Sequence, residues 1–314
     1  YCPMETVKRM QLILLTLATS ATLVATQDTQ AQSAPAAAPA TKPALTQALP
    51  RVYAYWRNAM VNKNYGAWKK ITAPHRRVHI QNRILSERRP FPAFVFNIPT
   101  APPALKGLKL ISSTSRGVTA KQVYFGKINF GVGGAPTENL LVLSFVYAER
   151  GWKYDSAEFI NLSGLKDVRK QIQSGDYKYV KGSAFQPTGV LPRTPIAVGK
   201  AKYIAKVYTF CPGREVKADV NRFSSHRLQN TQQSEVIIGG AKDGPNTINY
   251  TIKDLPDYKG DDPITIRVYL FSEVKGVKPV EVFRYQTKKG EKPKPSGRAV
   301  FHVTPEIAAR LRGK

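Results

Sequence analysis

The chain has 314 residues, of which 42% are hydrophobic and 10% are aromatic. This apolar content is enough to bury a core and excludes wholesale disorder, while two cysteines exclude a disulfide scaffold and a cysteine-rich zinc module. Lysine and arginine outnumber aspartate and glutamate by 48 to 21, so the formal net charge is +27. No run of about 18 apolar residues follows the first 25 positions, so we expect no transmembrane span in the mature chain.

Residues 1–31 have the pattern of a secretory signal peptide. Lys8 and Arg9 precede an apolar stretch over 12–24, which is too short to span a bilayer comfortably. Small residues at the end of the segment 1–31 predict cleavage after Ala31, and an uncleaved amphipathic anchor is the alternative. Residues 32–43 are an Ala/Pro tether that acts as a spacer. The protein is therefore predicted to be exported, to the periplasm or the extracellular space.

The first half of the mature chain, 44–163, is predicted to fold as helices followed by strands. Apolar residues at helical spacing predict a helix that starts at Pro50, and a basic second helix is expected over 75–87. A proline-rich loop over 90–105 follows. Strands are then expected at 108–114, 119–130, 140–148 and 152–160, with a hairpin between the last two.

The second half, 196–303, is predicted to contain strands throughout. Runs of β-branched and aromatic residues alternate with Gly, Pro, Asn and Asp turns, which is typical of an antiparallel sandwich. The Gly- and Pro-rich stretch 164–195 is expected to be a linker with a short helix at 165–172. A short C-terminal helix capped by Thr304 is expected within 304–314.

Three features of the first half occur in a characteristic order. They are a helix with Tyr53 and Trp56, the segment Asn64-Tyr65-Gly66-Ala67-Trp68, and the long hairpin ENLLVLSFVYAERGWKYDSAEFI. This order resembles the nuclear transport factor 2-like superfamily, the cone-shaped α+β fold of ketosteroid isomerase and scytalone dehydratase. The second half looks like a generic immunoglobulin-like sandwich. The expected fold class is therefore an α+β cone, with helices packed on a curved antiparallel sheet, followed by an all-β antiparallel sandwich.

The resemblance implies a pocket enclosed by the curved sheet and the helices. Some members of the superfamily are enzymes, and many are binding or assembly modules without chemistry. The residues expected to line the pocket are Tyr53, Trp56, Tyr124, Phe145, Tyr147, Tyr154 and Asp155.

Acid/base chemistry in such a pocket would need an Asp base with a Tyr donor, or a His–Asp pair. Asp155 with a nearby tyrosine is one candidate, and a surface acid paired with a lysine is the alternative. Asp155 and Glu158 have opposite parity on the last strand, so only one of them is expected to face inward. No Ser nucleophile elbow, phosphate-binding loop or Cys–His arrangement is found, and Gly131-Val132-Gly133-Gly134 is interpreted as a hairpin loop.

Metal sites are weakly indicated. His75 and His79 are four apart on a helix, but Arg76 stands where a zinc-peptidase motif needs Glu, and the surrounding arginines repel a cation. Four aspartates in one loop of the second half could bind calcium, and a solvated loop is the alternative. Cys211 is interpreted as a small apolar residue at a strand end. We therefore predict no metal and no cofactor. The four aspartates are Asp254, Asp257, Asp261 and Asp262.

Positive charge is concentrated in the first half. Twelve lysines and arginines lie between Arg51 and Lys109, against the single acid Glu87. Such a surface attracts polyanions, although a role in solubility alone is the alternative. No nucleic-acid-binding module is recognised. The residues expected to bind a polyanion or partner are Lys69, Lys70, Arg76, Arg77, Arg83, Arg88 and Arg89.

These observations favour an exported, non-enzymatic binding or assembly protein of the cell envelope. It would dock through its basic face on an envelope protein, an anionic polymer or a lipid surface. A carrier of a small apolar ligand in the cone pocket is the alternative, and a lyase or isomerase of the superfamily is a further one. The state of the pocket separates them, because a scaffold has a closed, aromatic-filled interior and an enzyme has an open one with a buried carboxylate.

Overall fold

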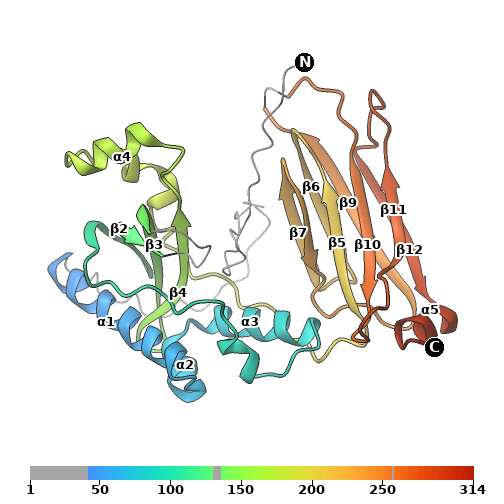
Figure 1. The fold of residues 1–314 in the computed structure, drawn as a ribbon, viewed down its shortest axis with the longest axis horizontal. Helices are drawn as coiled ribbons and strands as arrows, with labels where there is room; N and C mark the ends of the chain where they lie inside the picture. Colours follow the sequence, from blue (N-terminus) through green and yellow to red (C-terminus); the bar gives the residue numbers. More distant parts are fainter. Residues whose placement is uncertain (1–41, 130–135, 257) are drawn as a thin grey trace, which may run out of the picture. The chain divides into compact units, whose positions relative to one another are not determined.

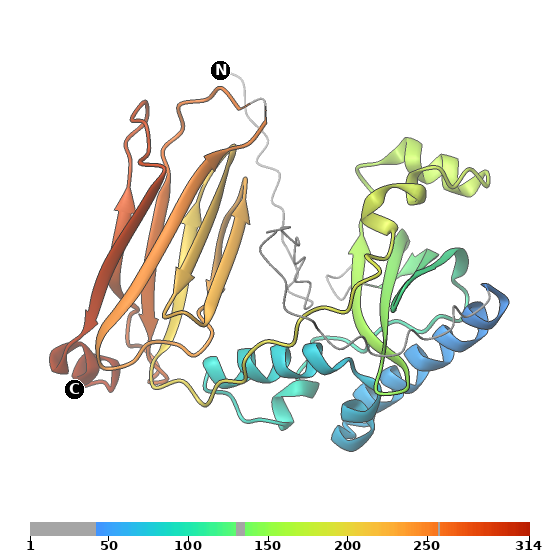
Figure 2. The same ribbon diagram turned by 180° about the vertical axis from the view of Figure 1, so that it is seen from behind.

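The computed structural model describes residues 42–129, 136–256 and 258–314 (Figures 1 and 2). The chain divides into two compact units, and the first contains the residues up to Arg77 together with Phe96–Thr194. The second contains Val78–Val95 and Pro195–Lys314. The expected signal peptide, nearly all of the tether and the glycine-rich loop at 131–134 lie outside the described residues.

Two helices begin the described part of the first unit. They are α1 (Lys42–Val61) and α2 (Tyr65–Ile71), and the Asn64 side chain caps α2 by accepting a hydrogen bond from the Ala67 amide at 3.0 Å. The prediction that the first helix starts at Pro50 is wrong, because Pro50 lies inside α1. Leu45 and Leu49 are fully buried, and this burial outweighs the hydrogen bond that a proline cannot donate.

A four-stranded antiparallel sheet follows in the simple order β1-β2-β3-β4. The predicted strands are all present, with β3 starting earlier than expected. Glu149 and Arg150 both have positive φ, as a tight hairpin between β3 and β4 requires. The strands are β1 (Lys109–Arg116), β2 (Thr119–Ile128), β3 (Thr137–Ala148) and β4 (Gly151–Ile160).

Both faces of this sheet are covered. Leu141, Leu143 and Phe145 of β3 pack with α1, whereas Leu140 and Val142 pack on the opposite face. The cover on that second face comes from α4 (Lys166–Gln173) and two short 3-10 helices (Figures 1 and 2). The segment expected to be a linker is therefore largely part of the first unit's core. Its buried side chains are Ile172, Val180 and Phe185.

Helix α3 (Pro74–Ser86) contributes its later residues to the second unit, although the whole helix was expected in the first domain. The Asn82 side chain donates to the Ile196 carbonyl and accepts from the Val198 amide. The Ser86 hydroxyl accepts from the Gly239 amide at 2.8 Å. These hydrogen bonds between side chains and backbone explain why the contacts of 78–95 lie with the second unit, which also includes most of the 3-10 helix Ala93–Phe96.

The second unit contains two four-stranded antiparallel sheets, in the orders β11-β10-β5-β8 and β12-β9-β6-β7. Helix α5 (Pro305–Leu311) follows, capped by Thr304 as predicted. The strands are β5 (Ile204–Phe210), β6 (Arg214–Val220), β7 (Ser224–Gln229), β8 (Gln232–Val236), β9 (Gly244–Asp254), β10 (Thr265–Phe271), β11 (Val280–Gln286) and β12 (Ser296–Val303).

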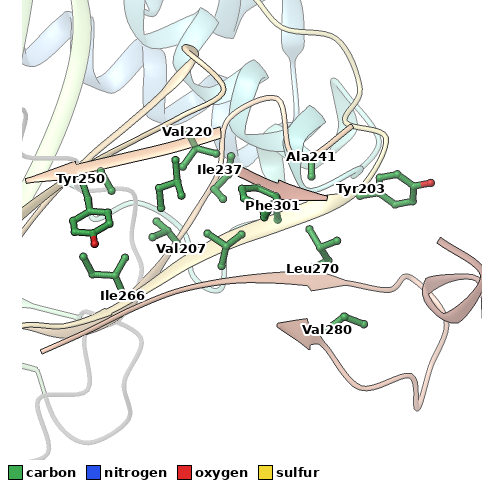
Figure 3. Packing of buried hydrophobic residues seen from close by; sticks show 14 of the residues in the cluster. Tyr203, Val207, Val220, Ile237, Ala241, Tyr250, Ile266, Leu270, Val280 and Phe301 are labelled. Atoms are coloured by element: carbon green, nitrogen blue, oxygen red, sulfur yellow. The ribbon is translucent and has the colours of Figure 1, made fainter. Parts of the chain in front are cut away.

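One hydrophobic cluster is shared by these two sheets (Figure 3). Val207 of β5 and Ile266 of β10 come from one sheet, and Val220 of β6 and Phe301 of β12 come from the other. Alternate residues of β5 are buried, as expected for a strand with one face on a core and the other outside. The alternation therefore fixes which side chains of each strand are available at the surface.

We predict that Gly240→Ala destabilises the protein far more than Gly276→Ala. Both glycines have positive φ, so both substitutions carry backbone strain of about 1–2 kcal/mol. A Cβ at Gly240 would also collide with the Tyr203 carbonyl, which cannot withdraw because it accepts a hydrogen bond from the Ala241 amide, whereas space is open around Gly276. Chemical denaturation should show losses of about 3 kcal/mol or more and about 1 kcal/mol respectively. Equal losses would contradict this packing.

Candidate functional site

The pocket predicted inside the first unit is filled by its own aromatic rings. Trp56 of α1 stacks on Tyr154 of β4 with 3.9 Å between ring centroids, and Tyr53 lies 5.7 Å from Trp56. Phe145 approaches Tyr154 edge-on at 6.3 Å, and Tyr124 belongs to the same buried cluster. The structure thus brings these five predicted residues together, and they form a core between α1 and the sheet.

The two remaining predicted pocket residues lie elsewhere. Tyr147 is half-buried and packs edge-on against Trp152 at 5.6 Å. Asp155 is buried, but it bonds to α3 and does not face the aromatic rings as a partner of a tyrosine. The predicted Asp–Tyr pair is therefore not formed.

The tyrosine hydroxyls in this core are engaged with fixed acceptors. Tyr53 donates to the Pro103 carbonyl at 2.8 Å, and Tyr124 donates to the Gln122 side-chain oxygen at 2.8 Å. Burial raises the pKa of both phenols well above the ordinary value, and the same holds for the pKa of Tyr154. All three hydroxyls therefore stay protonated, and those of Tyr53 and Tyr124 serve as structural donors.

A β-bulge directs Asp155 out of the regular alternation of β4. Ser144 pairs with Ser156 and the next residue, Phe145, pairs with Tyr154, so Asp155 has no partner across the ladder. Consecutive residues Tyr154 and Asp155 are consequently both buried. Glu158 is only half-buried, so one of these two acids is buried, in keeping with the expectation from parity, although a bulge and not simple alternation sets the position of Asp155.

The Asp155 carboxylate joins β4 to the first turn of α3. Its Oδ1 lies 2.8 Å from His75 Nε2 and accepts a hydrogen bond from Arg76 Nε at 3.0 Å. Burial raises the pKa of Asp155, but the hydrogen bond from His75 and the positive charge of Arg76 outweigh it and hold that pKa below its ordinary value. The expected lysine partner is thus replaced by a histidine and an arginine.

Further polar contacts connect the segment between α2 and α3 with β4 and the β3–β4 hairpin. The Ala73 amide donates to the Tyr154 carbonyl at 2.8 Å, and Lys153 Nζ donates to the Lys70 carbonyl at 2.8 Å. Arg77 binds Glu149 at 2.6 Å, and its charge and hydrogen bond lower the pKa of that carboxyl. The connection between α2 and α3 is therefore fixed to the sheet.

Most of the predicted basic face is already partnered. Arg83 lies 3.8 Å from Glu87, and Arg88 binds Glu273 at 2.6 Å. The Arg89 guanidinium lies 5.6 Å from the centre of the Phe94 ring. With Arg76 and Arg77 bound to acids in the first unit and the other three arginines in the second, the set is divided between units. Of the predicted residues, Lys69, Lys70 and Arg89 are exposed.

A groove of about 700 Å³ lies in the first unit, between α1, the loop after Thr100 and the end of β2. Such a volume fits a small ligand or a short segment of a polymer. Its apolar surface includes Leu108, Phe125 and Ile128, and Glu138 is its single carboxylate. Its cations are Arg57, Lys106, Lys109 and Lys127.

The wall of this groove is tied to α1. Arg57 Nε donates to the Pro102 carbonyl at 2.7 Å, next to the bond between Tyr53 and Pro103. Lys106 and Lys127 are exposed and form no ion pair among the described residues. Glu138 stands opposite Lys127 in the β2–β3 register and accepts from the Gln173 amide at 2.5 Å. Sequence reasoning missed this site because three distant segments form it.

The second unit contains a hydrogen-bonded Ser–His–Glu series that sequence reasoning also missed. Ser224 Oγ lies 2.7 Å from His226 Nε2, and His226 Nδ1 lies 2.8 Å from Glu235. This is the order of a serine-hydrolase relay. The Ser224 side chain is only 1% exposed and accepts from the Ile238 amide, so a substrate carbonyl cannot reach it in this conformation. The spacing Ser-x-His on a strand is the signal that could have found it.

The aspartate loop and Cys211 have structural partners. Asp254 accepts from Arg214 Nε at 2.8 Å, so a guanidinium occupies the place a cation would take, and Asp257 lies outside the described residues. Among the described residues, no three His, Cys, Asp or Glu side chains are grouped to hold a metal ion.

Cys211 is buried directly after β5, as predicted, and burial raises the pKa of its thiol.

Comparison with protein-family models, curated proteins and solved structures finds no match. Within the described ranges, no helix has the length and apolar character needed to cross a bilayer. The candidate site therefore rests on its own geometry and charge.

We predict that Asp155→Asn lowers the free energy of unfolding by about 2–4 kcal/mol at pH 7, since it leaves Arg76 buried without its charge partner. Because the folded pKa of Asp155 is depressed, its stabilisation is present above the unfolded pKa of about 3.9 and is lost as pH falls through the folded pKa. When the pH is lowered below about 4, the free energy of unfolding of Asp155→Asn should therefore fall less than that of the parent. Denaturation curves at several pH values measure this.

Glu158→Gln is the matched control, because Glu158 lies on the same strand and forms no ion pair among the described residues. It should change stability by less than about 0.5 kcal/mol and keep the acid dependence of the parent. An Asp155→Asn variant that behaved like this control would show that the buried carboxylate does not hold α3.

Proposed function

We propose that this chain is an exported, non-enzymatic binding protein of the cell envelope that docks on an anionic polymer or partner through the basic groove. The first unit is then a nuclear transport factor 2-like α+β cone, in keeping with its helices followed by a four-stranded antiparallel sheet. The second is an immunoglobulin-like β-sandwich, in keeping with two sheets around one core. The apolar leader over 12–24 is the basis for export.

The observation that carries this proposal is the charge of the groove. Four cations and one carboxylate line a volume of about 700 Å³. Its three lysines are all exposed without an ion-pair partner among the described residues, and Lys109 Nζ lies 5.5 Å from the centre of the Tyr177 ring. Charges within about one Debye length, roughly 8 Å at physiological salt, add their potentials. The arginines first expected to bind a polyanion have carboxylates or an aromatic ring beside them, so they attract an external anion less.

The filled interior favours binding at the surface over a carrier or an enzyme. A carrier needs an empty apolar cavity, but Tyr53, Trp56 and Tyr154 occupy the space between α1 and the sheet. An isomerase could use a His–Asp pair, and His75 and Asp155 form one, but both residues are buried and Arg76 also binds the carboxylate, so a substrate does not reach it in this conformation. In the first unit, the groove offers a hollow whose lysines form no ion pair among the described residues.

We predict that the double variant Lys106→Glu/Lys127→Glu binds inorganic polyphosphate at least ten-fold more weakly than the parent. The matched control is Lys275→Glu/Lys278→Glu, which changes the net charge equally at two exposed lysines of the second unit. Removal of local potential should weaken binding only in the groove variant. Fluorescence anisotropy with labelled polyphosphate at several salt concentrations measures both affinity and its fall with added salt.

Equal weakening by the two double variants would mean that net charge alone governs binding. That outcome would overturn the groove as the docking site and support a role of the positive charge in solubility.

Export has its own test. We predict that the chain, expressed with its leader in a secreting host, is recovered outside the cytoplasm with an N-terminus close to Gln32. N-terminal sequencing of the exported material measures this. Material that retained residues 4–20 would contradict cleavage and favour an uncleaved anchor.

A further inference from the structure

The outer face of the sheet β11-β10-β5-β8 carries an unusual set of side chains. Ala205, Val207 and Thr209 of β5 point to the core, so Lys206, Tyr208 and Phe210 point outward. By the same alternation, Arg267, Tyr269 and Phe271 of β10 point outward. These are the two central strands of the sheet. The outward face of an antiparallel sheet is typically polar, so four aromatic rings on these strands need an explanation.

The strand register interleaves the rings with positive charges. Tyr208 pairs with Arg267, and Lys206 pairs with Tyr269. Lys206 Nζ lies 5.1 Å from the centre of the Phe271 ring, within range of a cation–π interaction. Tyr208, Tyr269 and Phe271 therefore each have a cation beside them on the neighbouring strand, whereas Phe210 pairs with the polar residues Thr265 and Gln232.

Hydrogen bonds hold this arrangement. Arg267 donates to the Tyr269 hydroxyl at 3.0 Å and to the Gln286 side-chain oxygen at 2.9 Å. The Tyr269 hydroxyl lies 3.1 Å from Glu281, which also binds Arg284. The charged groups on this face are thus Lys206, Arg267, Arg284 and the single acid Glu281.

The face is hollowed as well as charged. A depression of about 310 Å³ is lined by rings and by groups that donate and accept hydrogen bonds. Apart from Thr265, these lining side chains are partly or fully exposed. The lining residues are Tyr208, Phe210, Gln232, Thr265, Arg267 and Tyr269.

We propose that this aromatic–cationic face binds an acidic polysaccharide. The flat apolar faces of sugar rings pack on aromatic rings, and sugar hydroxyls match the amide of Gln232 and the hydroxyls of Thr265 and the tyrosines. Carboxylate or sulfate groups on the sugar pair with Lys206, which forms no ion pair among the described residues, while Arg267 lies 3.6 Å from Glu281 and holds the Tyr269 hydroxyl in place. The site lies in the second unit, so it is independent of the groove in the first.

Acidic glycan is favoured over single-stranded nucleic acid by two observations. The leader sequence predicts export to a compartment where glycans are common polyanions. The depression also offers more hydroxyl and amide groups than cations, which suits a ligand rich in hydroxyls.

The test uses the full chain and polygalacturonate oligomers as the probe. Phe210→Ala should weaken binding at least ten-fold, whereas Phe210→Tyr should stay within two-fold because it keeps the aromatic face. The matched control is Phe223→Ala, a 56%-exposed phenylalanine of the same unit, which should also stay within two-fold. Thermal unfolding of each variant confirms that the chain is folded, and Phe210→Leu, which keeps apolar bulk without a ring face, should bind as weakly as Phe210→Ala.

Three outcomes would overturn the proposal. They are no binding of polygalacturonate by the parent chain, equal affinity of Phe210→Ala and Phe223→Ala, and tighter binding of a thymidine oligonucleotide than of polygalacturonate. Polyphosphate, which has no sugar ring, should bind Phe210→Ala and the parent alike. Phe210→Ala should weaken polygalacturonate binding by the same factor in the parent and in Lys106→Glu/Lys127→Glu, so the failure of the groove and the failure of this face are distinguishable.

Discussion

The first unit depends on one constraint, which is that β3 is apolar on both faces. Leu141 and Phe145 need cover from one side, and Leu140 and Val142 need it from the other. Helix α1 supplies the first cover together with an aromatic cluster, and α4 with the following 3-10 helices supplies the second. Because the rings of Tyr53, Trp56 and Tyr154 pack together between α1 and the sheet, they stabilise the interior of the unit, and the proposed docking site lies at its surface.

The buried polar groups follow the same logic. The bulge at Asp155 directs a carboxylate toward α3, where His75 and Arg76 satisfy it. A buried charge without such partners would cost several kcal/mol, so these three residues form a structural unit. The Ser224–His226–Glu235 series in the second unit is likewise a network whose nucleophile is covered. Chemistry-bearing side chains are thus held inside, while unpaired cations and partly exposed rings remain at the groove and on the β5–β10 face.

Local patterns predicted much of the fold. Helical spacing located α1 and α3 to within a few residues except at Pro50, and β-rich runs located the strands of the first unit and most of those of the second, because periodicity is encoded in neighbouring residues. The strands β7 and β12 were expected only as part of a strand-rich region. Sequence patterns missed three features that depend on residues far apart in the chain. These are the packing of 164–185 on the first sheet, the bulge at Asp155 and the partners of the arginines. Five of the seven predicted pocket residues do lie together, but the sequence could not show that they fill the pocket. The groove needed Arg57, Lys106 and Lys127 to meet, which no spacing predicts.

Hydrogen–deuterium exchange of the full chain, alone and with inorganic polyphosphate, tests the central claim most directly. The account predicts that amides of Ile172 and Val180 are protected together with those of β3, since they share one core. It predicts further that polyphosphate adds protection at 100–109 and 125–129, which line the groove, and leaves the amides of Tyr53 and Tyr154 in the aromatic interior unchanged. Rapid exchange throughout 166–185, or added protection centred on the aromatic interior, would contradict a filled interior with binding at the external groove.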